Sequence, residues 1–377
     1  MRDRVDLAVV IGTRPEAIKL APVLLAARGQ PSRFNLRIIR TGQHRELVDQ
    51  VLAEFNIVAD HDLDIMQSNQ DLAHVMAESV RGLSDLFTRH QPDWVLVQGD
   101  TTTTLAGSLA AFYTGVRLGH VEAGLRTGRR HSPFPEEMNR TLTARLADLH
   151  FAPTEEARDN LLREGTLAAD IVVTGNTVVD ALMWTRDRPG ADCAPAELRR
   201  PYLLVTTHRR ENHGAGLHRI CDAVVELLRK HVHLHVYLPM HPSPAVRSVL
   251  LARLGSEPRV SLTEPLGYGQ FVRAIIAAEL VLTDSGGVQE ECAVLGKPVL
   301  VLRADTERNE AVASGVAILV GTDPNCIVET ASALLSDQAA YGLMAQPSNA
   351  FGVGTASAKI LDALCGAGQA RHVRCEG

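Results

Sequence analysis

Short apolar runs alternate with longer stretches in which apolar residues recur at helical spacing along most of the chain. The first six runs, rich in β-branched residues, are DLAVVIG, FNLRIIRTG, DWVLVQGD, VRLGHVEAG, LHFAPT and DIVVTGN. Runs of this length and composition predict buried strands, and the spacing between them predicts covering helices. Strands that alternate with helices in this way indicate a parallel sheet with helices on its faces.

The alternation pauses at residues 187–201, where the segment DRPGADCAPAELRRP is rich in proline and charge. It restarts with YLLVTTH, HLHVYLPMH, RVSLTEP, ELVLTDSGG, PVLVLR and VAILVG. We therefore predict an α/β protein with two parallel-sheet domains, at residues 1–180 and 181–355. The run KILDALC predicts a last helix at 356–366, and the polar residues 367–377 predict a disordered tail.

Composition narrows the class of protein. A chain of 377 residues exceeds what one hydrophobic core usually holds, so it has room for two domains. Its 45% hydrophobic content, 22% charged content and net charge of −6 provide no basic excess for a nucleic acid partner. The sequence also lacks a leader pattern and any apolar stretch of about eighteen residues, so we expect a cytoplasmic protein without membrane association.

The cysteines argue against zinc and against a disulfide framework. None of the six has C-x-x-C spacing, and Cys221 and Cys292 lie in apolar helical segments, which favours reduced, packed thiols. The six are Cys193, Cys221, Cys292, Cys326, Cys365 and Cys375.

Several polar residues closely follow predicted strands. They are Arg14, Asp100, Glu122, His208 and Ser285. Ligands of open parallel sheets bind at the carboxyl ends of the strands, because loops and helix N-termini gather there. We therefore expect these residues to line one shared site.

The segment DSGGVQEE joins a predicted strand to a predicted helix through Ser285, Gly286 and Gly287. Unpaired amides and the positive end of a helix dipole hold a phosphate well, although a serine cap and a tight turn explain the segment equally. Arg14 and Arg308 could supply the opposing charge. The sequence contains neither G-x-x-x-x-G-K-[ST] nor G-x-G-x-x-G, which argues against a P-loop nucleotide triphosphatase and a dinucleotide dehydrogenase.

Two other patterns could hold a metal ion, but a simpler structural interpretation is favoured for each. Asp62 and Asp64 form a D-x-D motif in a polar stretch, where a solvated turn is the commoner structure. In HVHLHV, period two places His231, His233 and His235 on one strand face. Without a neighbouring acid or cysteine, a half-exposed strand face is favoured there, and we expect no bound metal.

The stretch HSPFPEEMNR pairs two glutamates with an arginine. A helix that starts near Pro135 would place Glu136 and Arg140 on one face, four residues apart, where an ordinary ion pair is an alternative to chemistry. Glu137 would point about 100° away around the helix and is the better candidate for capping.

Taken together, the motifs resemble those of the non-hydrolysing UDP-N-acetylglucosamine 2-epimerases. The resemblance runs from about residue 6 to about residue 365 and rests on GTRPEAIKLAPV, TGQH, VQGDTTTT, HVEAGLRTG, PFPEEMNR, GNTVVDAL, HRREN, DSGGVQEE and TER. It implies a GT-B arrangement, in which two Rossmann-like, doubly wound domains hold the sugar nucleotide between them and the helix at 356–366 crosses back to the first domain.

The resemblance also implies roles for individual residues. Its catalytic positions correspond to Asp100, Glu122, Glu136, Arg140 and His208. Its UDP and substrate positions correspond to Arg14, Lys19, Phe271 near the uracil, Ser285, Gly286 and Gly287 at the pyrophosphate, Glu291 at the ribose, and Arg308.

The implied reaction interconverts UDP-GlcNAc and UDP-ManNAc by eliminating UDP to give 2-acetamidoglucal and then adding UDP back. It needs no cofactor, because one group takes the C2 proton and another returns it from the opposite face. Asp100, Glu122 and Glu136 are the candidates, and the sequence does not assign the two roles among them. The product would supply cell-surface polysaccharide synthesis, and the resemblance implies a homodimer.

One departure concerns activation by a second UDP-GlcNAc. Members with this property carry a glutamine and an arginine where this chain has Glu46 and Asn69. The other positions of that candidate allosteric site match and are Gln43, His44, Arg210 and His241. The alternatives in function are an epimerase of another UDP-2-acetamido sugar, a hydrolysing epimerase, a GT-B glycosyltransferase and a sugar-nucleotide binder without catalysis.

Overall fold

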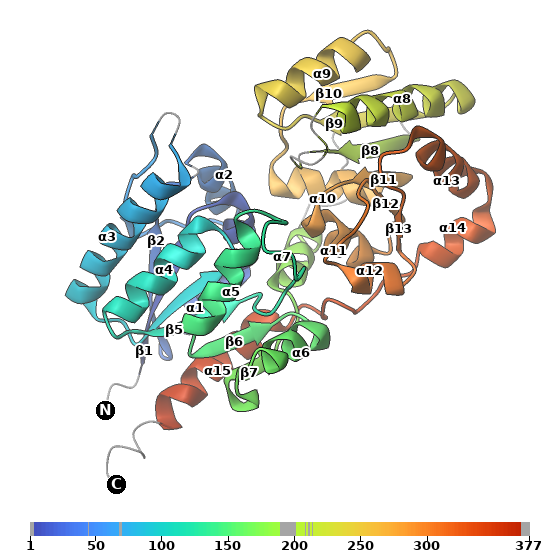
Figure 1. Cartoon of the computed structure of the whole chain (residues 1–377). Coiled ribbons are helices and arrows are strands. Elements are labelled where there is room, and N and C mark those ends of the chain that lie inside the picture. The colour runs from blue at the N-terminus through green and yellow to red at the C-terminus, as the bar shows by residue number, and fades with distance from the viewer. Residues whose placement is uncertain are drawn as a thin grey trace. The chain divides into compact units, whose positions relative to one another are not determined.

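The computed structural model describes residues 4–43, 45–67, 70–188, 201–207, 209, 212 and 214–370. The chain forms two compact units (Figure 1). Unit 1 comprises Met1–Ala181 and Gly352–Gly377, and unit 2 comprises Leu182–Phe351.

Unit 1 is built on a seven-stranded parallel sheet of order β3-β2-β1-β4-β5-β6-β7. Its strands are β1 (Val5–Ile11), β2 (Phe34–Arg40), β3 (His61–Asp62), β4 (Trp94–Gln98), β5 (Arg117–Val121), β6 (Leu149–Ala152) and β7 (Ile171–Val173). Its helices are α1 (Arg14–Arg28), α2 (Glu46–Glu54), α3 (Leu72–His90), α4 (Thr102–Tyr113), α5 (Glu136–Leu146), α6 (Glu155–Arg163), η1 (Ala168–Asp170), the start of α7 (Thr177–Arg186) and α15 (Ala356–Ala370).

Unit 2 repeats the plan with a six-stranded parallel sheet of order β10-β9-β8-β11-β12-β13. Its strands are β8 (Tyr202–Thr206), β9 (His235–Pro239), β10 (Val260–Thr263), β11 (Leu280–Thr283), β12 (Val299–Val301) and β13 (Ala317–Leu319). Its helices are α8 (Ala215–Lys230), α9 (Pro244–Leu254), α10 (Tyr268–Ala277), α11 (Gly286–Leu295), α12 (Asn309–Ala313), α13 (Pro324–Ser336) and α14 (Gln338–Met344).

All twelve predicted strands are present, so the α/β class and its two doubly wound sheets are confirmed. The central strands are mostly apolar and buried, as expected where helices cover both faces of a parallel sheet. In β11, for example, every residue is buried, and truncating Leu282 to alanine would cost about 2–5 kcal/mol of unfolding free energy.

Both sheets reverse their strand order next to the first strand of the unit. In unit 1 the reversal lies between β1 and β4, and in unit 2 it lies between β8 and β11. At such a point the loops after neighbouring strands lead to opposite faces of the sheet and leave room for a ligand. Of the predicted polar residues, Arg14 and Asp100 follow the two strands at this point in unit 1, and Ser285 follows β11 at this point in unit 2.

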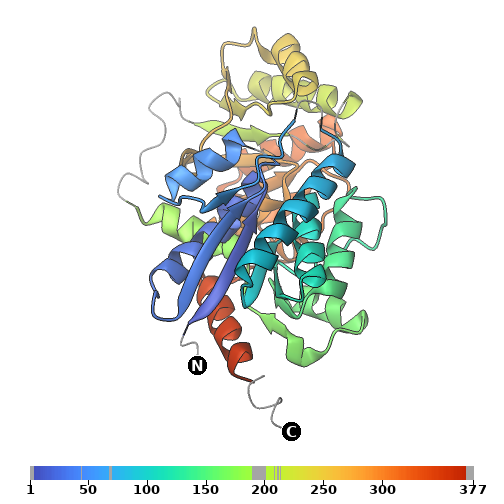
Figure 2. The same cartoon turned by 90° about the vertical axis from the view of Figure 1, so that its left-hand side faces the viewer.

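The last helix, α15, returns to unit 1. Figure 2 shows α15, in red, beside the blue elements α1 and β1. The carboxylate of Asp180 in α7 accepts hydrogen bonds from the amides of Ala356 (3.2 Å) and Ser357 (2.8 Å), which fixes the start of α15. The helix continues to Ala370, so the prediction that it ends at residue 366 was wrong.

The prediction of one strand face for the histidines of HVHLHV was also wrong. Helix α8 extends to Lys230, His231 terminates it, and β9 begins only at His235. The guanidinium of Arg259 donates to the carbonyls of Leu228 (2.8 Å) and His231 (3.3 Å), and thereby holds the turn between helix and strand.

Candidate functional sites of the two units

Glu122 directly follows β5, and its carboxylate is closely surrounded by hydrogen-bond donors. Its Oε1 accepts from Lys19 Nζ (2.5 Å) and from Asn176 Nδ2 (3.1 Å), and its Oε2 accepts from the amide of Gln98. Only 8% of Glu122 is exposed. These donors come from α1, β4 and the loop after β7, so they hold the carboxylate in one orientation.

The backbone of Glu122 is unusual as well. Its φ of +63° lies in the left-handed region, which residues other than glycine adopt rarely and at a cost of about 1 kcal/mol or more. Such a conformation at a buried carboxylate is typical of functional sites, because the surrounding structure must stabilise it.

Asp100 follows β4 and pairs with an arginine of α5. Arg140 contacts Asp100 Oδ2 through Nη2 (2.7 Å) and Glu137 Oε2 through Nη1 (3.6 Å). Asn139 Nδ2 donates to the carbonyl oxygen of Asp100 (2.9 Å) and fixes the same loop. The first half of α5 therefore positions the turn after β4.

Glu137 does not cap its own helix, so that prediction was wrong. It is 4% exposed, and its carboxylate accepts hydrogen bonds from the amides of Thr127 (3.1 Å to Oε1) and Gly128 (3.0 Å). It thus anchors the loop that leads to the PFPEE segment, while also contacting Arg140. Glu136, the first residue of α5, is half-buried, and the helix begins next to Pro135 as predicted.

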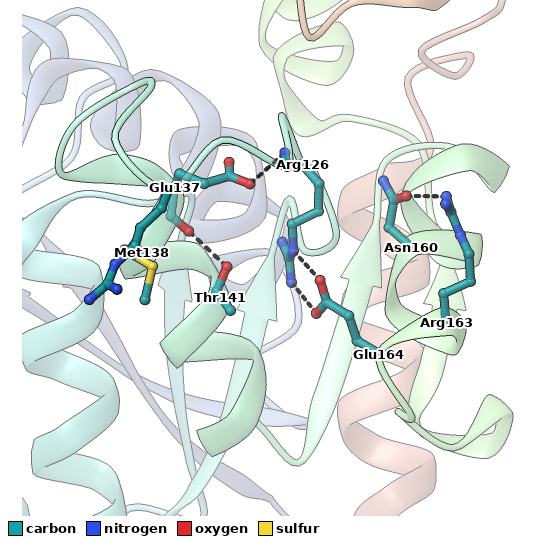
Figure 3. A pocket seen from close by; sticks show the side chains of 9 residues that line it. Arg126, Glu137, Met138, Thr141, Asn160, Arg163 and Glu164 are labelled. Atoms are coloured by element: carbon teal, nitrogen blue, oxygen red, sulfur yellow. Dashed lines mark hydrogen bonds and ion pairs between the residues drawn. The ribbon is translucent and has the colours of Figure 1, made fainter.

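A surface pocket of about 650 Å³ lies against this loop. In Figure 3 Glu137 forms one side, and Arg126 binds Glu164 through two nitrogens, at 2.7 and 2.8 Å. The hydrogen bonds from Arg126 hold the pKa of Glu164 below its usual range, although partial burial of the carboxylate opposes this shift. Three arginines, Arg126, Arg130 and Arg163, line the pocket, and one of them, Arg126, binds Glu164.

Two buried histidines lie side by side on β5 and β6. His120 and His150 are paired in the sheet register, and His120 Nε2 lies 2.7 Å from the carbonyl oxygen of Gly99. Burial lowers the pKa of His120 to about 3 and that of His150 to about 4. Both are neutral at pH 7, so the Nε2–H of His120 donates to Gly99 and fixes the residue before Asp100.

The switch point of unit 2 is organised by Asp284, which precedes Ser285. It is fully buried, and its Oδ2 accepts from Thr207 Oγ1 (3.1 Å), the amide of Arg209 (3.1 Å) and Asn212 Nδ2 (2.9 Å). Asp284 therefore holds the loop after β8 beside the start of α11.

Ser285, Gly286 and Gly287 form the predicted turn from strand to helix. Ser285 is extended and caps α11 by position, but among the described residues its side chain makes no capping hydrogen bond. A Cβ on Gly286 would lie 3.3 Å from Arg308 Cζ, whereas a Cβ on Gly287 would meet no atom within 4 Å. The space beside Gly287 is therefore open, whereas the Arg308 guanidinium and the Glu307 carboxylate both lie beside Gly286.

A buried cluster of charges supports that guanidinium. Arg308 Nε donates to Glu290 Oε1 (2.8 Å), and Arg308, Arg209 and Arg303 all contact Glu307 at 2.8–3.2 Å. Burial alone would raise the pKa of Glu307, but these three guanidinium groups hold it far below its usual range. Arg303 also contacts Asp305 (3.7 Å), so three arginines face three carboxylates, and the positive charge at the N-terminus of α11 is that of the helix dipole.

The remaining predicted residues lie in several places. Arg14 is the first residue of α1, Phe271 is half-buried in α10, and Glu291 is buried in α11. Gln43 accepts from Thr103 Oγ1 (2.8 Å), and exposed His241 accepts from the amide of Ser243 (3.2 Å). His44, Asn69, His208 and Arg210 lie outside the described residues, as do Cys193 and Cys375. A second UDP-GlcNAc site stays a prediction.

Sequence reasoning missed the supporting residues Glu16, Gln98, Asn176, Arg209, Arg303 and Glu307. Gln98 and Asn176 do follow or end predicted strands, so their position was a usable signal. The carboxylates of the D-x-D motif are occupied by arginines, since Asp62 pairs with Arg40 and Asp64 with Arg45 (3.0 Å).

The part of the chain that the structure describes contains no group of three or more His, Cys, Asp or Glu side chains placed to hold a metal ion. Within the same residues, no helix combines the length and the apolar character that crossing a membrane requires.

Comparison with known proteins agrees with this architecture. A family model described as UDP-N-acetylglucosamine 2-epimerase matches residues 26–365. The UDP-N-acetylglucosamine 2-epimerase of Escherichia coli (strain K12) is 48% identical over 365 residues, which are 94% of this chain and 97% of the relative. The enzyme of that name from Bacillus subtilis (strain 168) is 46% identical over 362 residues, which are 96% of this chain and 95% of the relative.

A solved structure shares both the fold and much of the sequence. The crystal structure of UDP-GlcNAc 2-epimerase from Neisseria meningitidis bound to UDP-GlcNAc has a TM-score of 0.91 and 44% identity, and it covers 95% of this chain and 99% of its own. Two Rossmann-like units with charged switch points place the protein in the GT-B class. Within that class, the chain belongs to the UDP-N-acetylglucosamine 2-epimerase family, and it is therefore an isomerase.

Proposed function

We propose that this enzyme interconverts UDP-GlcNAc and UDP-ManNAc without releasing free sugar. The observation that carries the proposal is the pair of carboxylates on adjacent turns of unit 1: Glu122 is held by three donors, and Asp100 is paired with Arg140. A Cβ on Gly99, the neighbour of Asp100, would lie 3.6 Å from Glu122 Oε2, so the two turns are in contact.

Unit 1 supplies the groups for proton transfer at C2 of the sugar. In the proposed route the bond between C1 and the phosphate oxygen breaks, the oxygen keeps the electron pair, and the C2 proton leaves to a carboxylate. The product is 2-acetamidoglucal, with a double bond between C1 and C2. UDP then returns to C1 while a proton reaches C2 from the opposite face, so atoms and electrons balance without an oxidant.

Asp100, Glu122 and Glu136 remain the candidates for the two proton-transfer roles. Positive charge develops on the ring as the C1–O bond breaks, and carboxylates on fixed turns stabilise it because they need no reorganisation. Arg140 orients Asp100, and Lys19 orients Glu122.

Unit 2 supplies the binding of UDP. The amides that start α11 and the guanidinium of Arg308 face negative charge that grows on the phosphate as it leaves. Buried Glu291, within the same helix, would hold the ribose hydroxyls, and Phe271 would lie near the uracil.

We also propose that the enzyme works in the cytoplasm as a homodimer, with a UDP sugar as its ligand, no nucleic acid partner and no cofactor. The described cysteines, Cys221, Cys292, Cys326 and Cys365, are free thiols, as expected for a reducing compartment. Light scattering of the purified protein would test the dimer directly.

The decisive experiment follows UDP-GlcNAc by proton NMR during incubation with the enzyme in D2O. We expect UDP-ManNAc to appear and deuterium to enter C2 of both sugars, because the returning proton comes from solvent. A variant with Glu122→Gln serves as the control for contaminating activity.

Other results would change the proposal in defined ways. Free N-acetylmannosamine together with UDP would indicate a hydrolysing epimerase. An unchanged spectrum despite binding would contradict UDP-GlcNAc as the substrate and favour another UDP sugar or a glycosyltransferase.

A further inference from the structure

Glu16, in the first turn of α1, is a buried carboxylate that connects two turns of unit 1. It is 1% exposed. Its Oε2 accepts from the amides of Gly12 (2.6 Å) and Thr13 (2.7 Å), directly before Arg14. Its Oε1 accepts from the hydroxyls of Thr101 and Thr104 (3.2 Å), directly after Asp100.

The two turns that Glu16 connects are tightly packed. A Cβ on Gly12 would lie 2.1 Å from Thr103 Oγ1, so only glycine allows this approach. Thr103 Oγ1 also lies 3.1 Å from Thr41 Oγ1, which adds the turn after β2 to the same cluster. A small change in the distance between these turns would therefore move several of the loops at the switch point.

Burying the carboxylate of Glu16 carries a desolvation cost that an apolar side chain would not have. Burial raises the pKa of Glu16, because the low-polarity surroundings disfavour its charged form, and the four donors oppose that shift. An apolar side chain would avoid the desolvation cost but would leave the amides of Gly12 and Thr13 without acceptors. The four donors on two separate turns explain why an acceptor with two oxygens is placed there.

We propose that Glu16 is a positioning residue, which fixes the turn carrying Arg14 relative to the turn carrying Asp100 through one carboxylate. The inference rests on the proposed function, since it gives these two turns roles in binding and in catalysis. Lys19, one turn further along α1, donates to Glu122, so residues on one face of α1 contact the three turns after β1, β4 and β5.

The experiment compares Glu16→Ala, Glu16→Gln and Leu24→Ala with the wild-type enzyme. Each protein is assayed for kcat and KM with UDP-GlcNAc, for UDP affinity by calorimetry, and for thermal stability. Leu24 is fully buried further along α1, so Leu24→Ala is a control that destabilises the helix without touching either turn.

We expect Glu16→Ala to lower kcat about a hundredfold, since loss of positioning by about 1 Å has effects of that size. UDP affinity should fall as well, by about tenfold, because the turn with Arg14 loses its anchor. Glu16→Gln should retain kcat within about tenfold of wild type, because its oxygen can accept from the two amides and its NH2 can donate to the threonine hydroxyls.

Three results would overturn the inference. One is Glu16→Ala behaving like Leu24→Ala in kcat, KM and UDP affinity, and another is Glu16→Gln being as impaired as Glu16→Ala. If the wild-type enzyme does not epimerise UDP-GlcNAc, the proposed function fails, but the effect of Glu16→Ala on UDP affinity still tests the positioning role. An affinity equal to wild type would then overturn it.

Discussion

Units 1 and 2 share a sheet plan but place opposite charges at the same topological position. In unit 1 the turns after β4 and β5 present the carboxylates of Asp100 and Glu122. In unit 2 the turn after β11 presents helix amides, and Arg308, from the loop after β12, lies beside them. The same βα framework thus serves two tasks, and the few residues after each strand decide which one. Unit 1 suits proton transfer and positive charge, whereas unit 2 suits an anion.

The largest effect should come from removing one carboxylate of unit 1. We expect Glu122→Gln to lower kcat by about a thousandfold, within the range for loss of a general acid or base, while UDP affinity remains near wild type. Turnover measured by NMR and UDP binding measured by calorimetry separate the two tasks. A loss of UDP affinity as large as the loss of kcat would contradict the division between the units.

The next effect concerns stability in acid. His120 and His150 have folded pKa values of about 3 and about 4, below the ordinary 6.5. Below pH 6.5 the unfolded chain binds protons that the folded unit 1 does not, so stability is full above pH 6.5 and falls as the pH is lowered. Each histidine should contribute up to about 1.4 kcal/mol per pH unit between pH 6.5 and about 4. Hydrogen exchange across that range, compared with His150→Gln, measures the effect in unit 1.

Unit 2 should respond to acid in a different window. The arginines around Glu307 keep its folded pKa below the ordinary 4.5, so the stabilisation is present above pH 4.5 and is lost as the pH falls further. Hydrogen exchange of peptides from α11 and β12 should therefore change only below pH 4.5. Loss of protection there between pH 6.5 and 5 would contradict this difference between the units.

A smaller effect is expected from crowding the anion site of unit 2. Gly286→Ala would place a Cβ 3.3 Å from Arg308 Cζ, tighter than most real contacts. We expect UDP affinity to fall about tenfold, or about 1.4 kcal/mol, with KM rising more than kcat falls. Gly342→Ala is a matched control, since its Cβ would have open space. Equal UDP affinities for the two variants would argue against α11 as the pyrophosphate site.

The smallest expected effect is that of a chelator. Because Asp62 and Asp64 are paired with Arg40 and Arg45, the D-x-D motif is engaged without a metal ion. Turnover before and after treatment with EDTA should agree within error. Activity that is lost with EDTA and restored by Mg²⁺ or Mn²⁺ would contradict the prediction of a metal-free reaction.

The sequence predicts the strands well because most are short runs rich in buried apolar residues, which leave a clear local pattern. It fails where a distant partner decides the structure. β3 has only two residues and exists through its pairing with β2. The turn at His231 depends on Arg259, which donates to carbonyls at the end of α8. Neither partner is visible in the local pattern.

The same contrast between local pattern and distant partner applies to the residues of the candidate sites. Residues directly after strands, such as Asp100 and Glu122, could be placed because sheet geometry brings them together. Glu137 was misassigned because its amide donors lie on a loop about ten residues earlier, outside the helical spacing used to interpret it. Glu16 contacts residues 101 and 104, and no short-range pattern predicts such a pair.

The return of the chain to unit 1 has a consequence for the order in which the two units are completed during synthesis and for the design of chimeras. The chain leaves unit 1 after Ala181 and re-enters at Gly352. A Cβ on Gly352 would lie 3.0 Å from Gly175 Cα, so exit and entry are adjacent. Unit 2 is thus an inserted domain, and the ribosome completes it before α15 is available to finish unit 1. A chimera between relatives should therefore replace residues 182–351 as one insert, because exchanging C-terminal halves would supply unit 1 with a foreign last helix.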